Sequence, residues 1–390
     1  MNYILFDGES RNDLLPLTYT RPVADLRVGI LTIREKWEKY LGYTTTTLTE
    51  DYLSAKYPLV EAEINLMINS SFCPTEKLVD LCKTLNKREA VYCNDQLVAF
   101  VSVEDEEPVL AEYKRIDFAG ELIEINYPWD IFKNNAQALK NDFELITKGR
   151  VSQPISETNR VLNPDLIFIE EGAEVEFAIL NAKDAPIYIG KNAKILENVS
   201  VRGGLALCDH SVIKMGAKIY GATTVGPYST VGGEVKNTVL TGYSNKGHEG
   251  YLGDAVLGEW CNLGADTNNS NLKNNYEEVK AWNYPEGRFI PTGQQFCGLI
   301  MGDHSKTGIN TMLNTGTVVG VSANIFGAGF PRNFIPSFSW GGSGKSITYR
   351  SDKAIATAKL VMERKGVEFT ETDKDIFQHI CEESSRYRRG

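Results

Sequence analysis

Short apolar runs alternate with one-sided apolar stripes over the first part of the chain. Residues spaced three and four apart mark one face of a helix, and such stripes predict helices from Leu26 to Tyr40 and over 128–147. Strands that alternate with helices predict an α/β domain over residues 1–150. The runs that predict its strands lie at 2–6, 44–48, 64–68, 91–93 and 97–101, the last two as a hairpin.

Beyond a linker expected over 151–164, aliphatic residues recur at every sixth position. A helix repeats about every 3.6 residues and a strand about every 2, whereas a six-residue period is typical of a hexapeptide β-helix. Such a helix is a triangular prism with the aliphatic side chains inside, and we predict it over 165–346. The period breaks near Asn237. The residues in the period are Ile189, Ile195, Val201, Leu207, Ile213, Ile219, Val225 and Val231, then Tyr251, Leu257 and Leu263, and, after a polar insertion, Met301, Thr307, Leu313, Val319 and Ile325.

The last segment, 347–390, returns to helical spacing and predicts a short helical C-terminus. Ser351 is a candidate cap for a helix over 352–365. Thr372 and Asp375 have the spacing of a capping box and predict the start of a second helix.

Composition and charge narrow the class of protein. The chain has 390 residues, of which 42% are apolar and 24% charged, so it is a folded protein of roughly two or three domains. A net charge of −10 argues against a nucleic-acid partner. The chain has no run of about 18 apolar residues, so we expect no membrane span. Its seven cysteines are scattered and never in C-x-x-C spacing, and we expect free thiols in a cytoplasmic protein.

Four histidines limit the candidate bases. His248 lies where the six-residue period breaks, so we expect it on a loop that leaves the prism. A histidine there suits acyl transfer, which needs a base near neutral pKa, although an ordinary surface residue fits the pattern equally. His210 and His304 fall within the repeat, and we expect both at the surface of the solenoid.

A longer motif surrounds His248. The run from His248 to Thr267 reads H-x-x-Y-L-G-D-A-x-L-G-x-x-x-N-L-G-A-x-T. It is similar, without a gap, to the acetyltransferase domain of the bifunctional UDP-N-acetylglucosamine diphosphorylase/glucosamine-1-phosphate N-acetyltransferase family. The repeat also resembles the left-handed parallel β-helix of hexapeptide acyltransferases. The resemblance implies acetyl-CoA as donor, glucosamine-1-phosphate as acceptor, and a homotrimer with its acetyl-transfer sites between subunits.

The resemblance also implies residue roles. His248 would be the base, Glu234 would orient or polarise it, and the backbone N–H of Ala265 would help to hold the oxyanion. The residues expected to bind the acceptor are Lys236, Tyr251, Asn262 and Asn271.

Three departures from the family pattern concern the acceptor. Leu272 stands where the family has tyrosine, Asp266 replaces a glycine, and the insertion over 272–300 is longer than usual. They leave open a different amino sugar as the acceptor.

A second motif lies near the N-terminus. The run L-x-P-L-T-x-x-x-P over 14–22 resembles the signature of sugar nucleotidyltransferases, and it implies a shortened, Rossmann-like nucleotidyltransferase domain that takes UTP and Mg²⁺. Val23 replaces the lysine of that signature, and no G-D-x-P segment for Mg²⁺ is found. Residues expected to bind the nucleotide are Gly8, Arg11, Arg21 and Arg27.

Three hypotheses therefore remain. The chain is a bifunctional acetyl- and uridylyltransferase, or an acyltransferase for another amino sugar, or an inactive regulatory protein that binds sugar nucleotides. In the first, both partners are small molecules, a sugar phosphate and a nucleotide. We predict no metal site formed by protein side chains alone.

Overall fold

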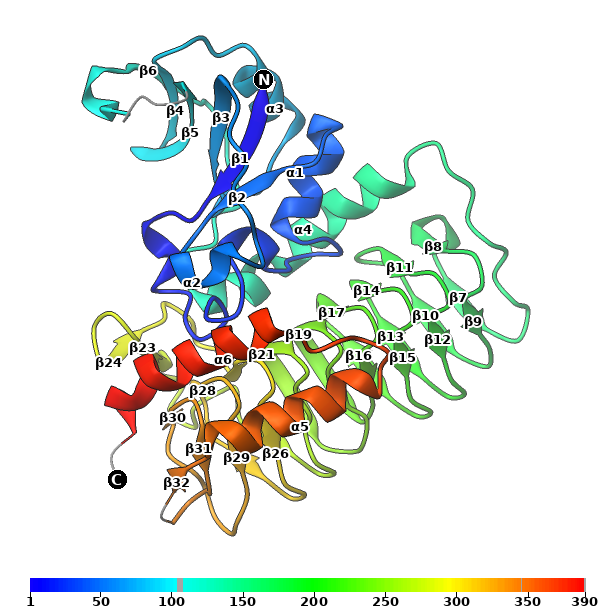
Figure 1. Cartoon of the computed structure of the whole chain (residues 1–390). Helices are drawn as coiled ribbons and strands as arrows, with labels where there is room; N and C mark the ends of the chain where they lie inside the picture. The colour runs from blue at the N-terminus through cyan, green and yellow to red at the C-terminus, as the bar shows by residue number, and fades with distance from the viewer. Residues whose placement is uncertain (104–107, 345, 389–390) are drawn as a thin grey trace.

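The computed structural model describes residues 1–103, 108–344 and 346–388 of the chain. An α/β domain lies beside one end of a long parallel β-solenoid, and two C-terminal helices run along the solenoid (Figure 1). This arrangement confirms the α/β domain, the β-helix and the helical C-terminus that the sequence predicts.

The N-terminal domain is built on a mixed six-stranded sheet of order β2-β1-β3-β5-β4-β6. β1 pairs in parallel with β2 and β3, while β5 runs antiparallel to both β3 and β4. The strands are β1 (Asn2–Phe6), β2 (Thr46–Leu48), β3 (Ile64–Asn69), β4 (Glu89–Cys93), β5 (Gln96–Val103) and β6 (Lys114–Asp117). The helices are α1 (Ile33–Leu41), α2 (Asp51–Ser54), α3 (Glu76–Lys83) and α4 (Pro128–Thr147).

The helix expected from Leu26 begins only at Ile33. Thr32 caps α1, because its side chain accepts the amide of Glu35 while the Glu35 carboxylate accepts the amide of Thr32. Gly29 precedes this cap in the left-handed region, with φ of +76°, and lies against the backbone of Ala138 in α4. The segment before Thr32 is therefore a buried loop, whose apolar residues pack without helical geometry.

The solenoid strands lie on three faces, which we call A, B and C. The long strands β19 and β21 bend around the corner from face C to face A, so each contributes to both. Face A holds β8 (Ile167–Ile169), β11 (Ile187–Ile189), β14 (Leu205–Leu207), β17 (Thr223–Val225), the later parts of β19 (Glu234–Gly242) and β21 (Tyr251–Glu259), β25 (Leu299–Met301), β28 (Thr317–Val319) and β30 (Phe334–Ile335). Face B holds β9 (Glu174–Val175), β12 (Lys194–Ile195), β15 (Val212–Ile213), β18 (Thr230–Val231), β20 (Asn245–Lys246), β26 (Lys306–Thr307), β29 (Asn324–Ile325) and β31 (Ser339–Trp340). Face C holds β7 (Arg160–Leu162), β10 (Ile179–Asn181), β13 (Ser200–Arg202), β16 (Lys218–Tyr220), the first parts of β19 and β21, β22 (Asn268–Asn269) and β27 (Met312–Leu313).

The solenoid interior follows the six-residue period from Ile189 to Val231 and departs from it in β19 and β21. Leu252, not Tyr251, continues the buried column above Val235, because the break near Asn237 changes the register of β21. Tyr251 instead lies half-buried on the outside of face C.

The ends of the solenoid also differ from the expected boundaries. β7 lies inside the expected linker and already pairs in parallel with β10. At the other end, β32 (Ile347–Thr348) adds an antiparallel strand to β31. The C-terminal helices are α5 (Ser351–Glu363) and α6 (Glu371–Glu383). The box that caps α6 is formed by Thr370 and Asp373, two residues before the pair expected from the sequence.

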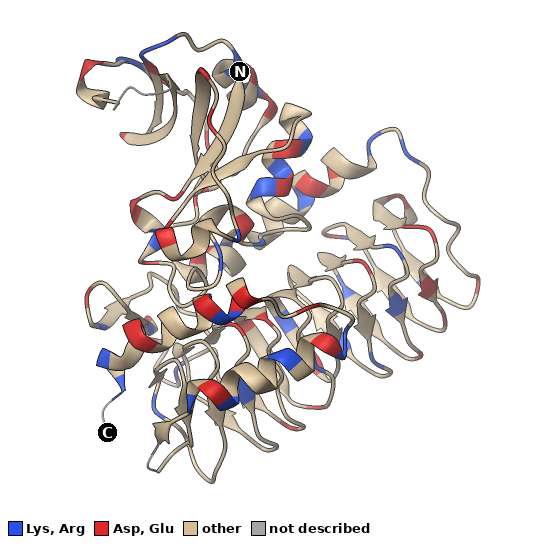
Figure 2. Ribbon diagram, viewed as in Figure 1, with Lys and Arg blue, Asp and Glu red and all other residues tan. Residues whose placement is uncertain are grey.

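The N-terminal domain shares a continuous apolar core with the outside of face A and with the C-terminal helices. α4 packs on face A, where the side chain of Asn135 donates to the carbonyl of Ala222 at 2.7 Å and accepts the amide of Gly29 at 2.7 Å. The polar insertion forms the antiparallel hairpin β23 (Lys280–Asn283) and β24 (Arg288–Pro291). Figure 2 shows Lys and Arg interleaved with Asp and Glu along α5 and along the solenoid.

Candidate functional site

His248 lies at the corner between face B and face C, on the short loop Gly247–Gly250 that joins β20 to β21. We call this segment the His248 loop. Its histidine side chain is exposed. The loop has the same length as the turns 196–199 and 214–217, which join face B to face C in earlier coils, and the exposed His248 side chain has no role in the core.

The His248 loop is held between the coils on either side of it. The amide of Glu234 donates to the carbonyl of Gly250 at 3.2 Å, and the amide of Asp266 donates to the carbonyl of Glu249 at 3.0 Å. Two predicted neighbours of His248, Glu234 and the turn that contains Ala265, are therefore brought beside it by backbone contacts.

The Glu234 carboxylate has a different partner within the chain. The hydroxyl of Tyr220 donates to it at 2.6 Å. Burial, followed by this bond to Glu234, raises the pKa of Tyr220 to about 12. Among the described residues no hydrogen bond joins the Glu234 carboxylate to the His248 ring, so the orienting role of Glu234 stays a prediction.

A polar cluster occupies the opposite end of face C. The Lys236 ammonium lies 3.3 Å from a carboxylate oxygen of Asp254, and the side chain of Asn237 donates to the other oxygen at 2.8 Å. Asn271 donates both to Asp254 and to the hydroxyl of Tyr251, the latter at 2.9 Å. We call Lys236, Asn237, Tyr251, Asp254 and Asn271 the face C cluster.

Asp254 is the centre of this cluster and was not among the predicted site residues. Its side chain is buried and accepts from three neighbours, so it fixes the positions of Lys236 and Asn271. Its place in the matched motif could have indicated a role. Its partners could not be deduced, because the corner where Asp254 adopts φ of +48° is visible only in the fold.

The Y-L-G part of the motif has a steric explanation. The Tyr251 ring lies back over its own strand, and a Cβ placed on Gly253 would fall 2.2 Å from the Tyr251 hydroxyl oxygen. Glycine at 253 therefore leaves the space in which the tyrosine ring lies flat on face C and reaches Asn271.

The two remaining predicted residues of the solenoid lie on face B and at the His248 corner. Asn262 is exposed on face B, where its backbone bridges Asn245 and Lys306. Ala265 is half-buried at the corner itself, and its carbonyl accepts the amide of Asn310 at 2.8 Å. Within one chain Asn262 is thus separate from the face C cluster, whereas Ala265 lies on the turn stacked over the His248 loop.

The insertion returns to face C and adds an aromatic ring there. Leu272 forms a backbone bridge with Phe296, whose ring lies 4.5 Å from the Lys236 ammonium. Phe296 is 39% exposed, so part of the ring is free beside the cluster. Its role could not have been predicted, because it depends on how the insertion folds back.

The candidate nucleotide residues of the N-terminal loop lie after β1. Gly8 approaches the side chain of Asn69 so closely that a Cβ would fall 2.7 Å from the amide oxygen. Arg11 is buried, with its guanidinium 3.1 Å from Asp7 and 2.9 Å from the hydroxyl of Tyr52.

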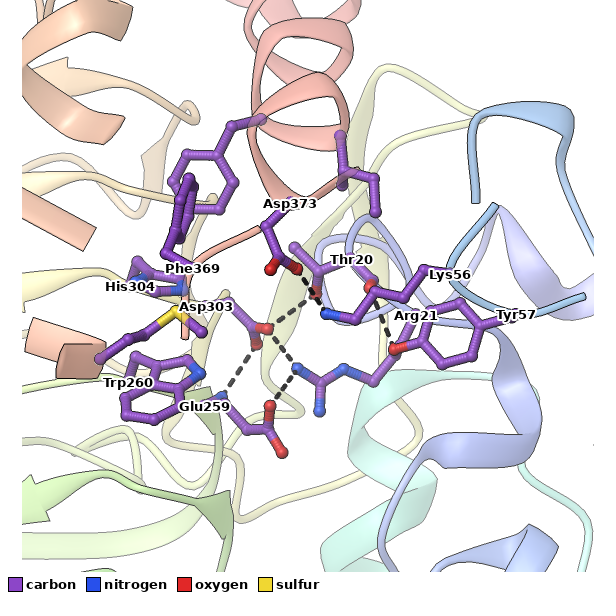
Figure 3. Close-up of a pocket in the computed structure, with 13 residues that line it drawn as sticks. Thr20, Arg21, Lys56, Tyr57, Glu259, Trp260, Asp303, His304, Phe369 and Asp373 are labelled. Carbon is purple, nitrogen blue, oxygen red and sulfur yellow. Dashed lines mark hydrogen bonds and ion pairs between the residues drawn. The ribbon is translucent and has the colours of Figure 1, made fainter. Parts of the chain in front are cut away.

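Two other candidate arginines join the N-terminal domain to the solenoid. Arg21 pairs with Asp303 and, at 3.2 Å, with Glu259, as Figure 3 shows. Arg27 donates to the carbonyl of Thr241 at 3.1 Å and to that of Ile30. Both arginines are buried, so they would have to leave internal partners to contact a nucleotide. Their assignment to a nucleotide stays a prediction.

His304 was expected at the solenoid surface, and this was wrong. The residue is 5% exposed, because the N-terminal domain and α6 close over its corner; its ring meets the edge of Phe377 and stacks on Trp260. Burial, followed by nearby Lys306, Lys56 and Arg21, lowers the pKa of His304 well below its ordinary value. His210 is exposed at the equivalent corner nearer the start of the solenoid, as predicted, and stacks on Tyr228.

Across the described parts of the chain, no group of three or more His, Cys, Asp or Glu side chains is arranged to hold a metal ion. None of the helices in the same residues has the length and apolar character needed to cross a membrane.

Comparison with known proteins finds similarity to sugar-nucleotide enzymes. Residues 3–151, which form the N-terminal domain, match the family model described as sugar nucleotidyl transferase. The chain is 30% identical over 213 residues to the bifunctional sugar-1-phosphate nucleotidylyltransferase/acetyltransferase of Sulfurisphaera tokodaii, a stretch of 55% of this chain and 47% of the relative. It is 26% identical over 257 residues to the bifunctional protein GlmU of Methanococcus aeolicus, or 65% of this chain and 54% of that protein. The chain spans about half the length of the curated relatives it matches.

Solved structures of acyltransferases are also similar. LpxA of Bacteroides fragilis, a UDP-N-acetylglucosamine acyltransferase, aligns with 58% of this chain and 96% of its own, at 15% identity and a TM-score of 0.25.

Proposed function

We propose that this chain transfers the acetyl group of acetyl-CoA to the amine of an amino sugar 1-phosphate at face C. The observation that carries the proposal is the placement of an exposed histidine at one edge of this face, with a fixed lysine and polar side chains at the other. A base and a phosphate-binding cation on one open face are what the reaction needs.

The proposed chemistry follows from these positions. The neutral His248 ring accepts a proton from the acceptor amine as its nitrogen attacks the thioester carbonyl. A carbon–nitrogen bond forms, the carbonyl oxygen becomes an oxyanion, and the carbon–sulfur bond then breaks to release CoA thiolate, which takes up a proton. The amide of Ala265, on the turn above the His248 loop, is proposed to donate to the oxyanion. Lys236 is proposed to pair with the sugar phosphate.

Glucosamine-1-phosphate is the first candidate acceptor. The face C cluster offers Lys236 to a phosphate and Asn271 and Tyr251 to sugar hydroxyls. Phe296 and Leu272 give this face an apolar edge, and this edge favours testing other amino sugars as well.

We also propose a homotrimer, in which a second copy would cover face C. Light scattering of the purified protein tests this oligomeric state.

Release of free CoA thiol from acetyl-CoA and glucosamine-1-phosphate tests the proposal. We expect turnover by the parent protein and a loss of about two to four orders of magnitude in His248→Ala, the usual contribution of a general base. His210→Ala is the matched control, because His210 is also an exposed corner histidine, and it should keep full activity. Equal activity in the parent and His248→Ala would show that His248 is not the base.

A second activity, nucleotidyl transfer, is favoured by the family match of residues 3–151. In this reaction a phosphate oxygen of the acetylated sugar 1-phosphate would attack the α-phosphorus of UTP, so that UMP is transferred to the sugar phosphate and pyrophosphate leaves. Pyrophosphate release from UTP and N-acetylglucosamine-1-phosphate in the presence of Mg²⁺ is the test. If no pyrophosphate forms, titration with sugar nucleotides decides between a binding domain and a structural one.

A further inference from the structure

A lysine occupies a position of the solenoid interior that is aliphatic in the neighbouring coils. On face B the two-residue strands from β9 to β29 place their second side chain inside the prism, and Lys246 pairs with Val231 of the coil before it. Lys246 is 1% exposed. The buried column contains Val175, Ile195, Ile213, Val231, Lys246 and Leu263.

The Lys246 ammonium contacts the His248 loop from inside. It donates to the carbonyl of His248 and, at 3.1 Å, to the carbonyl of Glu249. The carbonyl of Glu249 also accepts the amide of Asp266 from the next coil, whereas within the described residues the Lys246 ammonium is the donor to the carbonyl of His248. A buried carbonyl without a donor is unfavourable, and an aliphatic residue such as Val231 could not supply one.

The lysine is unfavourable for folding at its own position. Placing an ammonium group among aliphatic side chains costs free energy; this burial lowers the pKa of Lys246 to about 8, although the carboxylates of Glu249 and Asp266 oppose the shift. A residue that breaks the local pattern and costs stability is expected where function requires it.

We propose that Lys246 is a positioning residue for His248. By holding the carbonyls of the His248 loop from within the prism, it sets the backbone from which the His248 ring extends toward face C. Lys246 itself does not touch the substrate. The inference rests on the proposed acetyl transfer, because only that reaction needs the ring in one orientation.

Two aliphatic variants, Lys246→Met and Lys246→Leu, test the proposal, because their side chains match the rest of the column and should fold. Lys194→Met is the control: Lys194 lies on the same face but points outward, in an ion pair with Glu174. We expect kcat for thiol release to fall about tenfold or more in both Lys246 variants, as expected for a misplaced catalytic group. KM for acetyl-CoA should stay unchanged, and the thermal midpoint should not fall. The amides of Glu234 and Asp266, which donate to the loop, should exchange hydrogen faster.

Three results would overturn the proposal. One is an unchanged kcat in both Lys246 variants. Another is a thermal midpoint that falls in parallel with kcat, because that pattern would make Lys246 a structural residue only. The third is unchanged hydrogen exchange at Glu234 and Asp266. The exchange measurement needs no turnover, so it decides on Lys246 even if the parent protein proves inactive and the proposed function fails.

Discussion

Single residues around His248 depart from the rules of the repeat, and each departure has a contact that explains it. Lys246 replaces an aliphatic residue and binds the carbonyls of the His248 loop. Asp254 turns a corner in the left-handed region and accepts from Lys236 and Asn271. The sequence motif predicted His248 and the face C residues around it. It could not predict these partners, because residues far apart in the motif meet only after the chain has coiled.

The lowered pKa of Lys246 predicts a pH-dependent stability. The group titrates near pH 8 in the folded chain and near 10.5 when unfolded, so between these values the unfolded state binds more protons. The free energy of unfolding should therefore rise with pH across this window, by on the order of 2 kcal/mol. Urea unfolding at pH 7 and at about pH 10 would measure this rise as a difference between the parent and Lys246→Met. A difference that does not change with pH would contradict the lowered pKa.

Strands and helices follow their sequence patterns where the pattern is long. The helix over 128–147 and the hairpin at Asn94-Asp95 formed as predicted, whereas α1 begins at Ile33. The apolar spacing upstream of Thr32 came from loop residues buried by α4, and only the Thr32–Glu35 capping box marked the true start. Similarly, the register of β21 shifted by one residue, because the period alone does not fix where a strand resumes after a break.

Strand β21 offers a direct test of how face C is formed. In Gly253→Ala the new methyl group would meet the Tyr251 ring and displace it from Asn271, while Gly253 itself has no left-handed backbone to strain. We expect thiol release to fall about tenfold, because a misplaced binding group costs rate, and the thermal midpoint to change little. Gly216→Ala, at a corner with free space but φ of +72°, is the opposite case, since it should lower stability and keep activity. Full activity in Gly253→Ala would show that the Tyr251–Asn271 contact is not needed.

At the scale of the whole molecule, the two domains and the C-terminal helices share one core. Arg21 of the N-terminal domain inserts between Asp303 and Glu259 of the solenoid, and Thr20 donates to Asp303 at 2.7 Å. The sequence predicted two domains but gave no sign of these contacts between them, because ion pairs between distant segments leave no periodic pattern. It also assigned Arg21 to a nucleotide on the basis of its charge.

Removing the ion pairs that Arg21 forms with the solenoid should destabilise the chain strongly. Arg21→Met would leave the buried Asp303 carboxylate without its cation, at a cost of about 3–5 kcal/mol. Arg288→Met breaks an exposed pair with Glu286 and should cost less than about 1 kcal/mol. Thermal unfolding of both variants would measure these costs. Similar midpoints for the two variants would contradict a structural role for the Arg21 pair.

The central claim, acetyl transfer at face C, is tested most directly by identifying the product. Acetyl-CoA with an isotopically labelled acetyl group and glucosamine-1-phosphate would be incubated with the parent protein and with His248→Ala, and the label followed by NMR. We predict that the label appears on the sugar nitrogen with the parent and stays on CoA with His248→Ala. Label left on CoA by the intact parent, with glucosamine-1-phosphate and with every other amino sugar tested, would contradict the account.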